Sequence, residues 1–369
     1  MARPTSPLLL LCVIVAAAAQ LLAPAGAAKF ACNARGGAAR CQSLLGYTPR
    51  NATTLASVMS LFQVRSFRSL LAANGLPLST PPSRPVPAGA TVRVRFACAC
   101  SAGHGASMHR PFYKVAPGET LDGIARGVFA GFVTYQEIAA ANNISDPALV
   151  QAGQELHIPL PCSCDEVEGA AVVHYAHLVA AGSSASGIAA EFGTAEETLM
   201  SLNGIRDPKS LQAGQVLDVP LRACSSSISN ASIDHGLHVP NGSYILTANN
   251  CVLCSCSSST WQLECHPTKG LSSSACPAAT CGDLALGNSS SSTDCESKTC
   301  VYAGYTNTTT TTTASFNILT NLTTQSLCEA AGAPMPQPSA GFDLQSGVQW
   351  AYLAVLSICF NMALVGFVL

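Results

Sequence analysis

The 369-residue chain has few charged residues and no excess of positive charge. Asp, Glu, Lys and Arg make up 10% of the residues, and the formal net charge is -2 at pH 7. A protein that neutralises the phosphates of a nucleic acid needs a basic stripe on its surface. The sequence therefore predicts a protein that binds neither nucleic acid nor another polyanion.

Residue patterns typical of enzymes are also lacking. Glycan hydrolysis needs two placed carboxylates, but few acids follow residue 224, and no Ser/His/Asp or H-E-x-x-H pattern is found there. Asp165, Glu166 and Glu168 fall in a short connecting segment, where a solvated charge cluster is the expected role. Several histidines are too loosely spaced for a metal site, and we expect surface or strand positions for them: His174, His177, His235 and His238. We expect no catalysis, no metal and no cofactor.

Long apolar runs occur only near the two ends of the chain. Arg3 precedes the run at 8–19, and small residues follow at 25–28, which is the order of a secretory signal peptide. The uncharged segment 350–369 could span a bilayer. Small residues at 339–341, a polar spacer and this apolar tail are instead typical of a GPI signal.

We therefore expect three processed or anchoring segments. Residues 1–28 are the predicted signal peptide, 331–347 a stalk that carries the lipid at Ser339 or Ala340, and 348–369 the removed GPI signal. The expected location is the outer face of the plasma membrane.

Cysteine usage fits an oxidised extracellular protein. Of eighteen cysteines, Cys12 and Cys359 lie in the segments expected to be removed, which leaves six between 32 and 164 and ten between 224 and 328. Cys251 and Cys254 could form a zinc knuckle with Cys265 or His266, but disulfides are the expectation in a secreted chain. N-glycosylation sequons fit a surface protein: Asn51, Asn143, Asn230, Asn241, Asn288, Asn307 and Asn321.

One short phrase is repeated along the chain. "VQAGQELHIPL" at 150–160 returns as "LQAGQVLDVPL" at 211–221, and "VPAGATVRVRF" at 86–96 is a divergent copy. Each copy alternates apolar and polar residues, which predicts a half-buried strand entered through a Gly turn. The residues expected on the polar face are Arg93, Arg95, Glu155, His157 and Asp218.

Two short helices are expected before each closing strand. Thr134 with Glu137, and Thr194 with Glu197, are spaced as capping boxes that begin the second helix of two copies. That helix runs into Asn74-Gly75, Asn142-Asn143 or Asn203-Gly204, which suit a left-handed turn at its end. Short strands are expected before the first helices at 112–115 and 174–179. The repeat unit is therefore βααβ, with about fifty residues per copy.

These units resemble the LysM module. "YKVAPGETLDGIARGVF" at 113–129 is similar to its opening half, and "IAAANNISDPALVQAGQELHIPL" and "LMSLNGIRDPKSLQAGQVLDVPL" to its closing half. The resemblance is specific for the second and third units and weak for the first. The Cys-x-Cys pairs between units are similar to those of plant LysM receptor ectodomains, particularly GPI-anchored receptor-like proteins that bind chitin or peptidoglycan fragments.

The resemblance implies an α+β fold of tandem modules packed together by disulfides, followed by a cysteine-rich domain that is mostly β or irregular. The expected divisions are a degenerate module at 29–100, modules at 111–160 and 173–221, a linker at 222–250 and the cysteine-rich domain at 251–330. Six cysteines allow fifteen pairings by spacing alone. The family pattern implies Cys32–Cys100, Cys41–Cys164 and Cys98–Cys162.

The resemblance also implies where a glycan binds. In the family a chain containing N-acetylglucosamine lies between the loop after the first strand and the loop before the last. The matching positions in the second module are Ala116, Pro117, Gly118, Glu119 and Thr120, facing Asn143, Ile144, Ser145, Asp146 and Pro147. In the third module they are Gly182, Ser183, Asn203, Gly204 and Ile205, where Ala181-Gly182-Ser183-Ser184 replaces the Pro-Gly-Glu-Thr pattern.

A purely structural interpretation competes with this assignment. Pro117 and Gly118 suit a turn, Thr120 suits a helix cap, and Asp146-Pro147 suits the start of a turn. A glycan on Asn143 would lie beside the groove, and we expect this sequon to be unoccupied. The first module, with Gly46-Tyr47-Thr48-Pro49 in place of the opening loop, is expected to be structural.

The implied function is a pattern-recognition receptor of plant innate immunity that signals through a partner LysM receptor-like kinase. The ligand is chitin oligosaccharide or peptidoglycan, and the residues do not decide between them. Homo- or hetero-oligomers also stay open. The alternatives are a cell-wall protein that binds or scavenges glycan without signalling and, less favoured, a hydrolase that LysM modules deliver to its substrate.

Overall fold

The computed structural model describes residues 30–33, 40–170, 172–272, 275–291, 296–309 and 314–326. All of them except Glu296 and Ser326 belong to one compact unit. The predicted signal peptide, stalk and GPI signal lie outside the described residues, together with Ser339, Ala340, Cys12, Cys295, Cys328 and Cys359. Across the described ranges, no helix is both long enough and apolar enough to cross a membrane.

The first module has the βααβ order. Strand β1 pairs antiparallel with β4 from Arg40 opposite Ala99 to Tyr47 opposite Val92. The first helix begins after Thr54, whose hydroxyl accepts the N–H of Ser57 at 3.2 Å. The elements are β1 (Arg40–Tyr47), β2 (Thr53–Thr54), α2 (Leu55–Leu61), α3 (Phe67–Ala73), β3 (Pro85–Val86), β4 (Val92–Ser101) and β5 (His104–Ser107).

The second module repeats this order with shorter strands. Its elements are β6 (Phe112–Lys114), α4 (Leu121–Gly123), the π-helical turn η2 (Ile124–Val128), α5 (Tyr135–Ala141), the 3₁₀ turn η3 (Pro147–Leu149) and β7 (Glu155–His157). The capping box predicted at the start of α5 is confirmed: Glu137 accepts the backbone N–H of Thr134 at 2.8 Å, and Thr134 accepts that of Glu137 at 3.2 Å.

The third module is the most regular copy. Its elements are β8 (Val172–Leu178), α6 (Ala185–Phe192), α7 (Glu196–Leu202), the 3₁₀ turn η4 (Pro208–Ser210) and β9 (Val216–Cys224). The capping box predicted for Thr194 and Glu197 is wrong: α7 begins after Ala195 without a side-chain cap. Gly193, at φ 68°, ends α6, and the N–H of Thr194 closes that helix on the carbonyl of Ala189 at 3.0 Å. Thr194 is therefore used by the preceding helix.

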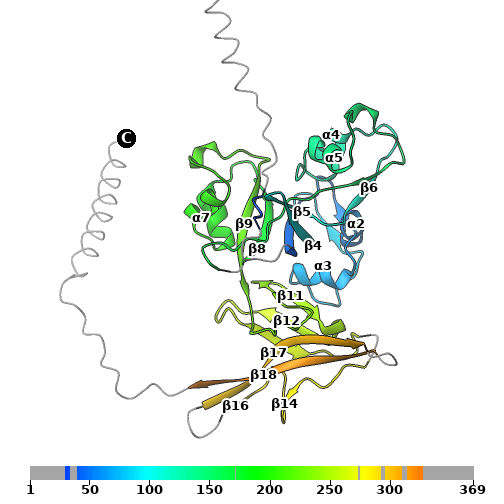
Figure 1. Ribbon diagram of the computed structural model, residues 1–369. Helices are drawn as coiled ribbons and strands as arrows, with labels where there is room; N and C mark the ends of the chain where they lie inside the picture. The colour runs from blue at the N-terminus through cyan, green and yellow to red at the C-terminus, as the bar shows by residue number, and fades with distance from the viewer. Residues whose placement is uncertain are drawn as a thin grey trace, which may run out of the picture. The chain divides into compact units, whose positions relative to one another are not determined.

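The first and third modules share one sheet (Figure 1). Strand β1 pairs parallel with β8, with Leu44 opposite Tyr175 and Leu45 opposite Ala176. The six strands follow the order β10-β9-β8-β1-β4-β5. Leu45 packs into the core formed by the first two modules, whereas Leu44 packs into the core of the third. The two faces of one strand therefore serve two cores.

The half-buried alternation predicted for the closing strands is confirmed in the first part of β4 and in β7 and is wrong for β9, where residues 216–221 are all buried. Asp218, expected on a solvent face, is only 2% exposed, and its carboxylate lies 2.8 Å from Nδ1 of His174. The other ring nitrogen of His174 lies 2.8 Å from the carbonyl oxygen of Asp165. Burial opposes protonation of His174, but Asp218 and then Asp165 outweigh it, so the pKa of His174 is raised. Arg95 is likewise not a solvated residue, as described below.

A repeated asparagine ties the second helix of each module to its closing strand. The side-chain amide of Asn142 donates to the carbonyls of Ile138 and His157, both at 2.8 Å, and its oxygen accepts the N–H of His157. Asn74 makes the same three bonds to Leu70 and Arg93, and Asn203 makes them to Leu199 and Asp218. The left-handed turn predicted after each asparagine is confirmed, because Gly75, Asn143 and Gly204 have φ values of 60°, 54° and 64°.

Three disulfides cross-link the first module and tie it to the segment that follows the second module. They join Cys32 to Cys100, Cys41 to Cys164 and Cys98 to Cys162, the pairs that the family resemblance implies. The connecting segment is not simply solvated as expected: the carboxylate of Asp165 accepts the backbone N–H of Asn33 at 2.9 Å and its side-chain amide at 3.1 Å.

The cysteine-rich region consists of small sheets. Residues 222–250, expected as a linker, belong to this fold: Cys224 bonds to Cys256, and β10 pairs with the end of β9. Three further disulfides are Cys251–Cys276, Cys254–Cys265 and Cys281–Cys300. The elements are β10 (Val239–Pro240), β11 (Tyr244–Thr247), η5 (Ala248–Asn250), β12 (Val252–Cys256), β13 (Leu263–Pro267), β14 (Thr280–Cys281), β15 (Leu284–Ala285), β16 (Ser289–Ser291), β17 (Glu296–Thr309) and β18 (Ala314–Ser326).

The asparagine bonds predict a stability difference between two adjacent residues. Asn142→Ala removes both amide donors and the acceptor from a partly buried site, so we expect the free energy of unfolding to fall by about 2 kcal/mol. Asn143→Gly is the matched control, because glycine occupies that place in the other two modules, and we expect a change within about 0.5 kcal/mol. Urea unfolding measures both variants, and equal losses would contradict the role of the Asn142 amide.

Candidate functional site

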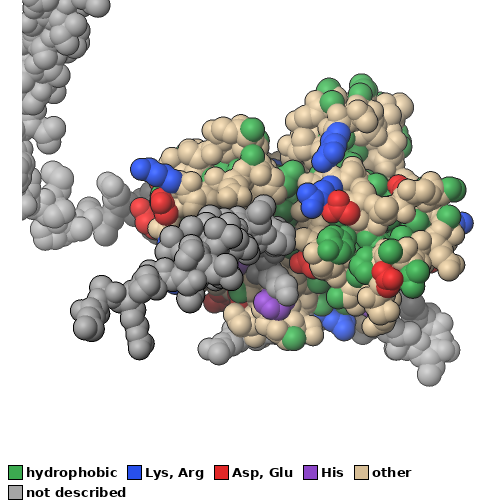
Figure 2. Space-filling model, turned by 90° about the horizontal axis from the view of Figure 1, so that it is seen from above, with side chains coloured by type: hydrophobic (Ala, Val, Ile, Leu, Met, Phe, Trp, Pro, Cys, Tyr) green, Lys and Arg blue, Asp and Glu red, His purple; other side chains and the backbone are tan. Residues whose placement is uncertain are grey.

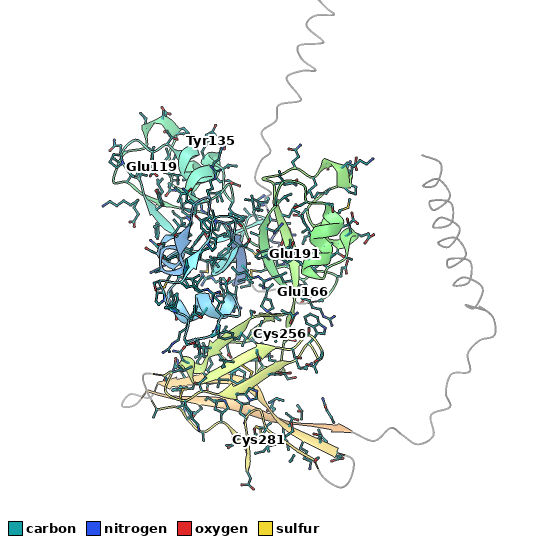
Figure 3. All side chains as sticks on the ribbon, turned by 180° about the vertical axis from the view of Figure 1, so that it is seen from behind. Glu119, Tyr135, Glu166, Glu191, Cys256 and Cys281 are labelled. Carbon is teal, nitrogen blue, oxygen red and sulfur yellow. A yellow bond between two sulfur atoms is a disulfide. The ribbon has the colours of Figure 1, made fainter. Side chains whose placement is uncertain are left out.

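Two loops leave the same end of the β6–β7 pair in the second module. The N–H of Val115 donates to the carbonyl of Gln154 at 2.9 Å, and the N–H of Gly153 donates back to Val115 at 2.8 Å. Residues 116–120 follow Val115 directly, and residues 143–147 precede Gln154 in the connection from α5 to β7. The structure thus places both predicted halves of the site on one module, where Glu119 and Tyr135 are labelled in Figure 3.

The first loop is held by a carboxylate within it. Glu119 accepts the hydroxyl of Tyr113 and the backbone N–H of Ala116, each at 2.8 Å. Burial, and then the bond to Glu119, raise the pKa of Tyr113 to about 12, so this phenol stays protonated as a donor. Gly118 has φ 82°, which suits glycine at the turn. The hydroxyl of Thr120 accepts the N–H of Gly123 at 3.1 Å and caps α4.

The second loop is held mainly by its own backbone. The N–H of Ile144 donates to the carbonyl of Ala139 at 2.9 Å, and its half-buried side chain packs on the core. The carboxylate of Asp146 accepts the N–H of Ala148 at 2.9 Å, which starts the η3 turn at Pro147. Leu149 on that turn is 69% exposed. Sequence reasoning missed Leu149 as a candidate contact, although it lies two residues after Pro147 and directly before the repeated phrase at 150–160.

These bonds limit what the loops can offer a ligand. The side chains of Glu119, Thr120 and Asp146 already hold the loops, so the structural roles weighed against ligand contact are real. Exposed Pro117, Gly118 and Ser145, with apolar Ile144 and Leu149 beside them, present backbone groups and small apolar surfaces. Such a surface suits a ligand with amide groups and methyl groups and without net charge.

The third module repeats this geometry with less side-chain support. Gly182 has φ 83°, and the N–H of Ser183 donates to Ala180 at 3.2 Å. The N–H of Ile205 closes on Met200 at 2.9 Å, as that of Ile144 does on Ala139. Both amide donors of Asn203, a residue predicted to contact glycan, are used within the module, so its side chain has a structural role. Gly182, Ser183 and Gly204 are exposed.

The cysteines considered for a zinc site have disulfide partners. Within the described residues, the two groups of side chains close enough to share a metal consist of cysteines already in disulfides. Cys251 and Cys254 pair with Cys276 and Cys265 instead of forming a knuckle.

All seven sequon asparagines are exposed. On the face in Figure 2, charged side chains are scattered over a mostly uncharged surface.

Three βααβ units that each carry the same asparagine bonds define a protein of tandem LysM-type modules. A family model described as "LysM domain" matches residues 113–159 and 177–220, which are the second and third modules.

Similar proteins extend this match over nearly the whole chain. The sequence is 44% identical over 341 residues, 92% of this chain and 93% of the relative, to "Chitin elicitor-binding protein" of Oryza sativa subsp. japonica. It is 45% identical over 77% of this chain and 81% of the relative to "LysM domain-containing GPI-anchored protein 2" of Arabidopsis thaliana. "Chitin elicitor receptor kinase 1" of Physcomitrium patens is 22% identical over 51% of this chain and 28% of the relative. The chain belongs to the family of LysM domain-containing proteins represented by the first two.

The bonds of Glu119 predict how the first loop responds to substitution. Glu119→Ala removes the acceptor of the Ala116 N–H, so we expect this amide to exchange with solvent at least about tenfold faster. Glu155→Ala, at an exposed position on β7, is the control and should leave the exchange of Ala116 unchanged. Hydrogen exchange read by NMR tests both variants. An unchanged rate in Glu119→Ala would show that the carboxylate does not hold the loop.

Proposed function

We propose that this protein is a cell-surface receptor that binds N-acetylglucosamine-containing glycans, with chitin oligosaccharides favoured over peptidoglycan fragments, through the second module. The observation that carries the proposal is the pair of loops at 116–120 and 143–147, whose charged side chains are already bonded within the loops. What remains exposed suits a chain of uncharged acetamido sugars. The name of the rice relative, 44% identical, supports the same ligand.

The names of these relatives describe a chitin elicitor-binding protein, a GPI-anchored LysM protein and a chitin elicitor receptor kinase. They support the proposal that this protein binds glycan without hydrolysing it. A scavenging wall protein would bind the same ligand, and only a signalling partner distinguishes the two functions.

Calorimetric titration of the purified protein, with its N-glycans removed, tests the binding site. Ile144→Asp removes an apolar contact and adds an unpaired carboxylate beside the ligand, so we expect the affinity for chitin octamer to fall by about 2 kcal/mol, roughly thirtyfold. Ile205→Asp is the matched variant in the third module and should change the affinity little. Thermal melts of both variants confirm folding.

The other outcomes are equally informative. A loss of affinity in Ile205→Asp alone would move the site to the third module. Tighter binding of soluble peptidoglycan than of chitin octamer would contradict the preference for an uncharged ligand. Long chains can engage several subsites or two receptors, so equal binding of dimer and octamer would contradict a multivalent receptor.

We further propose that a GPI lipid attaches the protein at Ser339 or Ala340 and that a LysM receptor-like kinase carries the signal. The "GPI-anchored" name of the Arabidopsis relative and the similarity of the moss kinase support this arrangement. We expect such a kinase to co-precipitate with the protein after chitin octamer is added, and not with Ile144→Asp. Consistent absence of the kinase from precipitates of responsive cells would refute the signalling step.

A further inference from the structure

Arg95 is a half-buried cation whose terminal guanidinium nitrogens have no hydrogen-bond partner among the described residues. Strand β4 carries it opposite Leu44 of β1, and these two nitrogens are shielded from solvent. Burial lowers the pKa of Arg95 to about 10, so the side chain remains charged at neutral pH. A buried charge without a partner is strongly unfavourable. The site therefore favours the binding of an anion.

The side chain borders a cavity of about 860 Å³. Its walls come from β1 and β4, from α3, and from the segment around residues 233–246 in the cysteine-rich region. Small-molecule sites in proteins commonly have volumes of this order. Hydroxyl and amide groups of Ser66, Ser69 and Gln42 line it together with apolar Met108 and Leu237. This mixture suits a small polar molecule with an apolar part.

The acidic groups that line the cavity have other contacts. The carboxylate of Asp234 accepts the hydroxyls of Thr247 and Tyr302, both at 2.7 Å. That of Asp165 accepts the N–H of Asn33 at 2.9 Å. Glu166, labelled in Figure 3, is exposed where the third module meets the cysteine-rich region.

The other basic groups on the walls are Arg40, Arg68, His235 and His238. Arg68 is already bound, because it donates to the carbonyl of Leu271 at 2.6 Å. Arg40 is exposed. Arg95 is therefore the enclosed cation that a ligand in the cavity would meet.

We propose that this cavity binds a small acidic sugar, whose carboxylate is held by the guanidinium of Arg95. The planar guanidinium donates two parallel N–H bonds to a carboxylate. The choice of a sugar acid rests on the proposed glycan-receptor function, because free N-acetylmuramic acid is N-acetylglucosamine with an added lactyl group, whose carboxylate is free once the peptide of peptidoglycan has been removed. The site is separate from the loops of the second module, so the two can be tested independently.

N-Acetylmuramic acid and N-acetylglucosamine are a matched pair of probes, since they differ only by the lactyl group that carries the carboxylate. We expect calorimetry to show binding of the acid, and at least about tenfold weaker binding of the neutral sugar. Arg95→Leu should abolish binding of the acid without lowering the melting temperature of the free protein, because it removes an unpaired buried charge. Arg95→Lys keeps the charge but loses the paired N–H donors, so its affinity for the acid should lie between those of the wild type and Arg95→Leu. Arg93→Leu, two residues away on β4 and outside the cavity lining, should bind as the wild type does.

Each contrary result overturns the proposal. Equal binding of the two sugars, or binding of inorganic phosphate as tight as that of the acid, would remove the assignment to a sugar carboxylate. A large drop in the melting temperature of free Arg95→Leu, repeated in Glu166→Gln, would show that Glu166 is the partner of Arg95. Chitin octamer binding should be unchanged in Arg95→Leu. If octamer binding is absent from the wild type while the acid binds, the proposed function fails and this site stands.

Discussion

Three disulfides around the segment 162–164 set the position of everything that precedes the cysteine-rich region. They close chain separations of 68, 123 and 64 residues, and cross-links over such lengths remove much of the entropy of the unfolded chain. Hydrogen bonds continue the connection, because the hydroxyl of Ser43 on β1 donates to the carbonyl of Ser163 at 3.1 Å. With the segment tied to β1 and β4, β8 follows within a few residues and pairs with β1. The shared sheet depends on this placement.

Local structure was largely predictable from the sequence, whereas contacts between modules were not. The βααβ order, the capping box at Thr134 and the left-handed turns after three asparagines depend on residues close together in the chain, and the structure has all of them. The predicted cap at Thr194 failed because Gly193 ends the preceding helix there. Asp218 was placed on a solvent face because alternation alone does not show that a second strand and a histidine cover it.

The candidate loops were also located by sequence, but the roles of their side chains were not. Glu119, Asp146 and Asn203 seemed available to a ligand as residues in exposed turns, yet each is bonded within its own module. The clue was the asparagine that occurs at the same place in all three copies, which marks a structural requirement of the repeat. No sequence pattern indicated Arg95, because its surroundings depend on residues of β1, α3 and the cysteine-rich region, which only the fold brings to the cavity.

Repeat proteins often gain or lose units through duplication and deletion of gene segments. The pairing of β1 with β8 restricts that route here, since strands of the first and third modules are neighbours in one sheet. Excision of the third module would expose an edge of β1 and the side chain of Leu44, which packs into the lost core. We therefore expect the first and third modules to be retained together, whereas the second can vary within its own loops.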